Sequence, residues 1–261
     1  MNGPVVVEVD GSASSRAAVE TAAWEAGRHG VGLRLAHAVA SPARDVWSDA
    51  AGWDPDGGGG LRDRVKRVLA EAERRALRVA PHLSITSDVL IGEPVTVLRS
   101  EAEDASLTVL GGPLPRGFGV GLLVAPGRCP VLVTRGRPNP SGTVVLTAGA
   151  LPGSWRAAEF AFAEASARGA DLVVPHARTF FAARLLDGPG GAIPALRKRY
   201  PEVTVRPYRG RTRRALLRAA AGAQLVVVGT HGRPGLAPGS AGRTLLRHAH
   251  CSVAVVPAGK A

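Results

Sequence analysis

The chain is poor in the residue types that mark several common classes of protein. Its two cysteines, Cys129 and Cys251, are too few for a disulfide framework. No apolar run approaches the roughly 20 residues that a membrane-spanning helix needs, and no charged start followed by an apolar core marks a secretory signal. We therefore expect a soluble, cytoplasmic protein in which both cysteines are small buried hydrophobic residues.

Lysine and aromatic side chains are also scarce, although the chain is strongly basic. Its 261 residues carry a net charge of +12, and lysine occurs only at Lys66, Lys198 and Lys260. A basic chain can bind nucleic acid, but aromatics are only 4% of the sequence and do not interleave with the arginines, so no base-stacking platform is visible. The favoured interpretation is a general bias toward Arg, Ala, Gly and Pro, and we expect neither a nucleic-acid nor a membrane partner.

The most informative stretch covers residues 225–256. The continuous apolar run from Leu225 to Val228 is typical of a parallel strand that is buried on both faces. A glycine-rich loop follows, then a segment of helical periodicity that starts at Ser240, and then a second apolar run that ends before Pro257. Glycines after a strand let the backbone approach a ligand, and free N–H groups at the next helix start favour an anion. The pattern therefore indicates a strand, a phosphate-type loop, a helix and a strand.

The glycine pattern of this stretch resembles the universal stress proteins. It runs Gly229-x-x-Gly232, a short loop, Gly239-Ser240, and later Ala249-x-Cys251 before the last strand. The resemblance implies that this loop holds the phosphates of ATP in the members that bind it. Six residues separate Gly232 from Gly239, where the family usually has about nine, so the loop is shorter than the family pattern.

The organisation of the first half returns in the second. Asp10-Gly11-Ser12 follows the first strand and resembles the start of a universal stress domain, and the Ser-x-Arg-Ala-Ala pattern at residues 14–18 recurs at residues 154–158. A linker rich in Pro and Gly, residues 135–142, lies between the halves. We therefore predict two universal stress-like domains, at 1–136 and 143–258.

Each half alternates strands and helices, which demands right-handed crossovers and a parallel sheet. The expected class is α/β, with two tandem doubly wound parallel-sheet domains. The resemblance implies strand order 3-2-1-4-5 in each domain and antiparallel pairing of the two fifth strands, which places residues 131–133 beside 253–256 in an internal pseudo-dimer. Further homo-oligomerisation and a protein partner stay open. The expected elements include strands at 5–9, 33–39, 85–91, 107–110, 129–133, 144–147, 172–174, 203–206, 225–228 and 253–256, and helices at 61–79 and 95–104.

Each half keeps one part of a nucleotide site at the point where the strand order reverses. The first half keeps the acid, Asp10, but Leu114 and Phe118 stand where the loop's second glycine and serine belong. In the second half Ala150 replaces the acid, whose role in the family is to contact the base or ribose side of the ligand. That half keeps the loop, and its candidate binding residues are Gly229, Gly232, Gly239 and Ser240, with Ala177 after its second strand. We expect at most weak ATP binding, in the C-terminal domain, in a stress-response regulatory protein with no catalytic residue and no metal site.

Two other classes of function stay open at this point. One is a protein-interaction module whose nucleotide sites have decayed, and the other is a weak ATP hydrolase that uses the C-terminal loop. His37 and His176 lie at matching strand ends and are interpreted as core or backbone-bonded histidines. An arginine cluster around Gly210 is either a solvated helix start or an anion site that assists the short loop; its members are Arg206, Arg209, Arg211, Arg213, Arg214 and Arg218.

Overall fold

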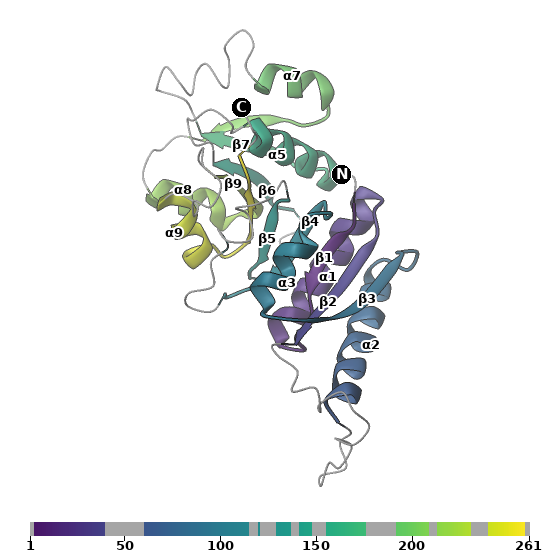
Figure 1. Ribbon diagram of the computed structural model, residues 1–261. Helices are drawn as coiled ribbons and strands as arrows, with labels where there is room; N and C mark the ends of the chain where they lie inside the picture. Colours follow the sequence, from purple (N-terminus) through teal and green to yellow (C-terminus); the bar gives the residue numbers. More distant parts are fainter. Residues whose placement is uncertain are drawn as a thin grey trace. The chain divides into compact units, whose positions relative to one another are not determined.

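The structure is a computed structural model, and its described residues are 3–39, 60–114, 120, 129–136, 141–147, 155–175, 192–208, 213–230 and 240–258. The chain divides into two compact units, Met1–Leu114 and Pro115–Ala261. Both units alternate strands with helices (Figure 1). In the described ranges, no helix combines the length and the apolar character needed to cross a membrane.

The described part of the first unit is a parallel sheet with its covering helices. Its strands lie in the order β3-β2-β1-β4, and each neighbouring pair is parallel. The elements are β1 (Val5–Glu8), α1 (Ala13–His29), β2 (Leu33–Val39), α2 (Leu61–Val79), β3 (Ile85–Ile91), α3 (Pro94–Glu101) and β4 (Leu107–Gly111).

Local sequence features set the ends of helix α1 and allow it to pack close against the sheet. The hydroxyl of Ser12 accepts a hydrogen bond from the Ser15 N–H at the start of the helix, and Gly30 ends it in the left-handed conformation, at φ 63°. The stripe that faces the sheet is made of small residues, of which Ala18, Ala22 and Ala26 are fully buried. Because alanine adds little bulk, α1 packs close against β1 and β4.

The described part of the second unit repeats this plan and adds two strands. Its order is β5-β10-β9-β6-β7-β8, and every neighbouring pair is parallel except β5 with β10. All seven residues of β9 are buried, as the continuous apolar run predicts. The elements are β5 (Val131–Thr134), β6 (Thr143–Thr147), α5 (Trp155–Arg168), β7 (Leu172–Pro175), α7 (Ala192–Arg199), β8 (Val205–Tyr208), α8 (Arg213–Ala221), β9 (Ala223–Gly229), α9 (Ser240–His248) and β10 (Ser252–Val256).

Strand β5 pairs with β10 in antiparallel register. Val131, Leu132 and Val133 lie opposite Val255, Ala254 and Val253, and all six are buried. The predicted pairing of residues 131–133 with 253–256 is therefore confirmed. It also explains why β5 belongs to the second compact unit, although the sequence repeat assigns it to the first domain.

The α/β class and most of the predicted strand order are confirmed. The second unit shows the whole 3-2-1-4-5 order as β8-β7-β6-β9-β10, and the first unit shows β3-β2-β1-β4. The helix predicted at 61–79 is found at those residues. The domain borders 1–136 and 143–258 stay a prediction.

Several element ends differ from the predictions by two or three residues. Helix α3 ends at Glu101 instead of residue 104, because the Ala102 N–H caps it on the Leu98 carbonyl and residues 102–104 form a turn. Strand β8 begins two residues later than predicted, and β9 begins two residues earlier because Ala223 pairs with Thr143 across a register shift. Hydrogen-bond partners decide these ends, and periodicity alone does not reveal them.

The burial of β5 leads to a matched stability test. Val133→Asp places a carboxylate where the side chain is buried, and we expect a loss of about 3 kcal/mol or more in the free energy of unfolding. Val89→Asp makes the same change on β3, where the valine is 39% exposed, so the loss should be about 1 kcal/mol or less. Urea unfolding of the full chain measures both, and equal losses would contradict the buried position of β5.

Candidate functional site

The turn after β1 carries the predicted acid, Asp10. Strand β1 lies between β2 and β4, so this turn sits where the strand order reverses. One carboxylate oxygen of Asp10 accepts a hydrogen bond from the Ser12 N–H at 2.8 Å, and the Asp10 N–H donates to the Ser15 hydroxyl at 3.1 Å. Asp10 is exposed. The acid therefore stands at the predicted edge of the sheet, and part of its hydrogen-bonding capacity stabilises its own turn.

The glycine that ends β4 is held close to the start of α1. A methyl group on Gly111 would lie 2.6 Å from the Ser14 carbonyl carbon and 2.9 Å from the Ser15 nitrogen. These are backbone atoms, which cannot swing aside as a side chain can. The glycine is therefore required for the packing of α1 against β4, whether or not a ligand binds. Sequence reasoning missed this role, because the contact joins segments about 100 residues apart.

Helix α2 packs against the same turn from another side. A methyl group on Gly11, whose φ is +80°, would lie 3.2 Å from a methyl carbon of Val68. The Arg16 guanidinium donates to the Gly11 carbonyl at 2.6 Å. The turn that presents Asp10 is thus fixed by α1 and α2 together.

The corresponding edge of the second unit is formed by the ends of β6 and β9. Gly229 ends β9 and is buried, and a methyl group there would lie 3.2 Å from the Ala157 side chain of α5. Thr147 donates to the Val227 carbonyl at 3.2 Å, while Thr230 receives the Ala258 N–H at 3.0 Å and donates its own N–H to Val256 at 2.9 Å. These bonds align the ends of β6, β9 and β10 where the glycine loop begins.

Part of the predicted loop falls within the described residues. Helix α9 begins at Ser240, as predicted, and its first N–H groups therefore lack intrahelical acceptors. Gly232, Gly239, Ala177 and the Ala150 position lie outside the described residues. The structure thus brings the ends of β6, β9 and β10 together, and the assignment of the loop glycines stays a prediction.

Several of the remaining sequence candidates have structural roles. The His37 ring donates from Nδ1 to the Val9 carbonyl, which confirms the interpretation as a backbone-bonded histidine; His176 lies outside the described residues. Both cysteines are buried, as expected, and burial raises the pKa of Cys251 to about 11. In the arginine cluster, Arg206 pairs with Asp171 at 2.8 Å.

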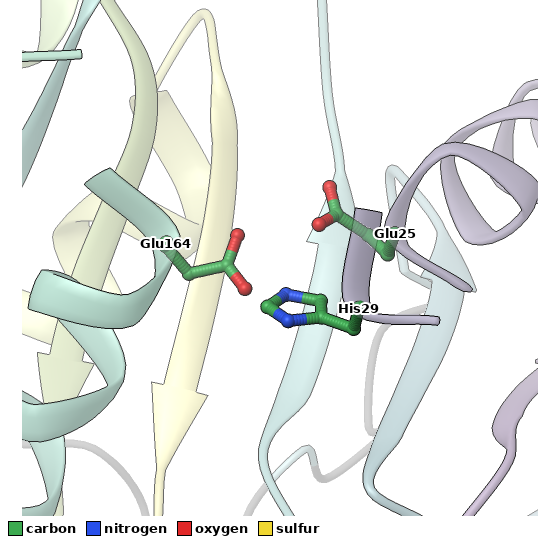
Figure 2. Close-up of side chains that lie close together, drawn as sticks. All are labelled: Glu25, His29 and Glu164. Atoms are coloured by element: carbon green, nitrogen blue, oxygen red, sulfur yellow. The ribbon is translucent and has the colours of Figure 1, made fainter. Parts of the chain in front are cut away.

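A buried acid recurs on the first helix of both units. Glu25 of α1 and Glu164 of α5 are each 1% exposed. Glu25 accepts from Arg28 at 3.5 Å, and Glu164 accepts from Arg168 at 2.9 Å, so each carboxylate has an arginine on its own helix. Figure 2 shows Glu25 and His29, which lie one turn apart on α1, and Glu164 on α5. Both helices therefore carry a buried acid, a polar feature that helical periodicity did not predict, although the Ser-x-Arg-Ala-Ala alignment matches Glu25 with Ala165 and not with Glu164.

Fold and site together define the class of this protein. Two successive α/β repeats with an acid or a glycine after the strands at the reversal point are typical of proteins that bind ligands at that edge of the sheet. A family model described as Universal stress protein family matches this chain over residues 1–119 and 142–257. The chain belongs to this family.

Individual relatives agree with this membership. The chain is 31% identical to Universal stress protein Rv2005c of Mycobacterium tuberculosis over 269 residues, covering 89% of this chain and 88% of the relative. It is 30% identical to Universal stress protein Rv2623 of the same organism, with 96% and 95% covered. Among solved structures, a universal stress protein from Archaeoglobus fulgidus matches with a TM-score of 0.72 at 16% identity, covering 99% of this chain and all of that one, which shows the shared fold.

The two equivalent glycines give a prediction about packing. Gly111→Ala places a methyl group against backbone atoms, so we expect a loss of about 3 kcal/mol in the free energy of unfolding. Gly229→Ala meets only the Ala157 methyl group at 3.2 Å and should cost about 1 kcal/mol or less. Denaturant titrations of both variants make the comparison, and a larger loss at Gly229 than at Gly111 would refute the packing role of Gly111.

The acidic end of β1 gives a prediction about pH. Burial raises the pKa of Glu8, and the negative charge of Asp10 raises it further. Because its folded-state pKa lies above the unfolded-state value, ionisation of Glu8 disfavours the folded state, and stability falls as the pH rises through the folded-state pKa. Glu8→Gln should therefore raise the melting temperature at pH 7, and this gain should shrink as the pH falls below the ordinary pKa of glutamate.

Thermal melts of both proteins at several pH values check this expectation. Asp10→Asn is the companion variant, because it removes the second cause of the shift and should give a smaller gain of the same sign. A loss of stability in Glu8→Gln that stays constant with pH would show that Glu8 contributes a structural interaction and no electrostatic penalty.

Proposed function

We propose that this chain is a non-catalytic, regulatory universal stress protein of the cytoplasm that binds an adenine nucleotide weakly, with the phosphates on the C-terminal loop. The observation that carries the proposal is the unequal state of the two sheet edges. In the first unit the acidic turn, the tightly packed Gly111 and the following Pro113 leave little for a phosphate to bind. The second unit retains the glycine sequence and the start of α9 behind it.

Electrostatics support the same assignment. The first edge carries Glu8 and Asp10, whose negative charges repel a phosphate, and Asp10 already raises the pKa of Glu8. The corresponding end of β6 has no acid, since its last residues are Leu146 and Thr147 and the sequence continues Ala148-Gly149-Ala150. The second edge therefore favours an anion but lacks the acid that would orient a nucleoside. One lost charge-assisted hydrogen bond, about 1.5–3 kcal/mol, weakens binding about tenfold to a hundredfold.

The domain arrangement that we propose rests on the pairing of the two fifth strands. The borders are 1–136 and 143–258, and β5 of the first domain pairs with β10 of the second as an internal pseudo-dimer. The antiparallel register between these strands supports this arrangement. Because both candidate edge strands are then covered, the chain needs no second copy to protect them, and further self-association is a separate question.

One observation favours a second candidate, a protein-interaction module without nucleotide. Gly111 serves packing, so a family glycine can be retained for structure alone. Nucleotide extracted from the purified protein would support the first candidate, and its absence together with the absence of ATP binding would support the second. Phosphate release from added ATP would instead indicate a weak hydrolase and contradict the non-catalytic assignment.

A thermal-shift experiment tests which half binds. A ligand at about 100 times its Kd stabilises the folded state by about 2.7 kcal/mol, and we expect millimolar ATP to give a much smaller shift because its site is incomplete. Gly232→Val should abolish the shift, because a branched side chain enters where the backbone approaches phosphate. Asp10→Ala should leave the shift unchanged. The reverse pattern, with loss in Asp10→Ala alone, would place the working site in the first domain.

A further inference from the structure

The positive charge of the chain is concentrated in its second part. Residues 1–114 contain 12 Lys and Arg against 16 Asp and Glu, whereas residues 115–261 contain 21 against 5. No acidic residue follows Glu202. A general composition bias would act on both parts of the chain, so it does not account for a net charge that is negative in one and strongly positive in the other. Such asymmetry is a feature of proteins that contact polyanions.

Four exposed arginines of the second unit lie on two neighbouring helices. Helices α8 and α9 lie side by side in Figure 1, and Leu216 and Leu245 join them in one buried core cluster. On each of the two helices, two arginines are four residues apart, which places their side chains on one face of that helix. We call this set the basic face: Arg214 and Arg218 on α8, and Arg243 and Arg247 on α9, all exposed.

The charges of the basic face are not neutralised by described residues. Elsewhere in the second unit arginines pair with acids: Arg168 with Glu164, Arg199 with Glu159, and Arg206 with Asp171. Within the described ranges, none of the four arginines of the basic face forms an ion pair or a side-chain hydrogen bond. Four like charges held on adjacent helices raise the local potential, which an external anion would lower.

The character of the surrounding surface selects the kind of anion. In the described residues the exposed large apolar side chains are Trp24, Val89, Ile91 and Trp155, and none of them lies on α8 or α9. Helices that bind membrane surfaces need bulky apolar residues to insert, and protein interfaces need buried aromatic or aliphatic anchors. The basic face offers only guanidinium groups, whose planar forks bind phosphate bidentately.

We propose that the basic face binds duplex nucleic acid through its phosphates, without reading the base sequence. This departs from the expectation of no nucleic-acid partner, which rested on the lack of aromatic residues. Aromatics are required for stacking on the bases of a single strand, but the phosphates of a duplex are contacted by arginine alone. The proposal is independent of nucleotide binding at the C-terminal loop.

Fluorescence anisotropy of the full-length chain with a labelled, mixed-sequence DNA duplex of about three helical turns tests the proposal. The test variant replaces all four arginines of the basic face with glutamine. The matched control removes four exposed arginines of the first unit that form no ion pair with any described residue: Arg64, Arg74, Arg78 and Arg99, each to glutamine. Both variants lower the net charge equally, so a difference between them reports position and not total charge.

We expect the wild-type chain to bind the duplex at about 50 mM salt and to lose affinity steeply toward about 200 mM. The basic-face variant should bind at least about tenfold more weakly, and its plot of log affinity against log salt should be shallower by about three to four. The control should stay within about threefold of wild type. Thermal melts verify that both variants fold, and Arg247→Glu against Arg99→Glu repeats the comparison with one substitution each.

Three outcomes would overturn the proposal. The first is a wild-type chain that does not bind the duplex at low salt. The second is an equal loss in both quadruple variants, which would show an effect of net charge alone. The third is a stronger preference for phosphatidylglycerol vesicles or for polyglutamate than for the duplex, which would assign the face to a membrane or to an acidic protein.

Discussion

Backbone hydrogen bonding between β5 and β10 is the interaction on which the second unit depends most. Both strands are almost wholly buried, and a buried N–H or carbonyl without a partner is costly. Strand β10 bonds β9 on one side, and without β5 its other side would be an open apolar edge. The chain supplies that partner from the sequence of its first repeat. The two repeats are therefore joined by a shared ladder as well as by the linker.

The strands and their order could be predicted from the sequence because buried parallel strands are continuous apolar runs. The runs at 5–7, 225–228 and 253–256 are all buried. Helix α9 begins at Ser240 as predicted, and Ser12 and Gly30, residues of types that favour helix ends, mark the ends of α1. The ends of α3 and β8 could not be predicted as well, since single hydrogen bonds decide them.

The candidate site was only partly predictable, for a related reason. The place of Asp10 after β1 follows from a local motif, and the structure has it at the reversal point of the sheet. The packing of Gly111 against Ser14 and the contact of Gly11 with Val68 join distant segments of the chain. No pattern within one element reports them. A glycine after a strand can therefore serve ligand binding or helix packing. Only the neighbouring atoms distinguish the two roles.

The two repeats have diverged in charge as well as in motif. The first unit presents an acidic turn at its sheet edge and carries a surplus of acids, whereas the second lacks that acid and carries the whole surplus of basic residues. In the proposed account, this division of charge confines anion binding to the second unit. Asp10 is then the remnant of a site whose phosphate loop has been lost, and the C-terminal loop is the remnant of a site whose acid has been lost.

The stoichiometry of ATP binding tests this central claim most directly. Equilibrium dialysis of the purified full-length chain against labelled ATP counts sites without relying on stability or on a substitution. The account predicts saturation at about one ATP per chain, with an affinity about tenfold to a hundredfold weaker than that of a site with both acid and loop. Saturation at two ATP per chain would show that both edges are competent and would contradict the account.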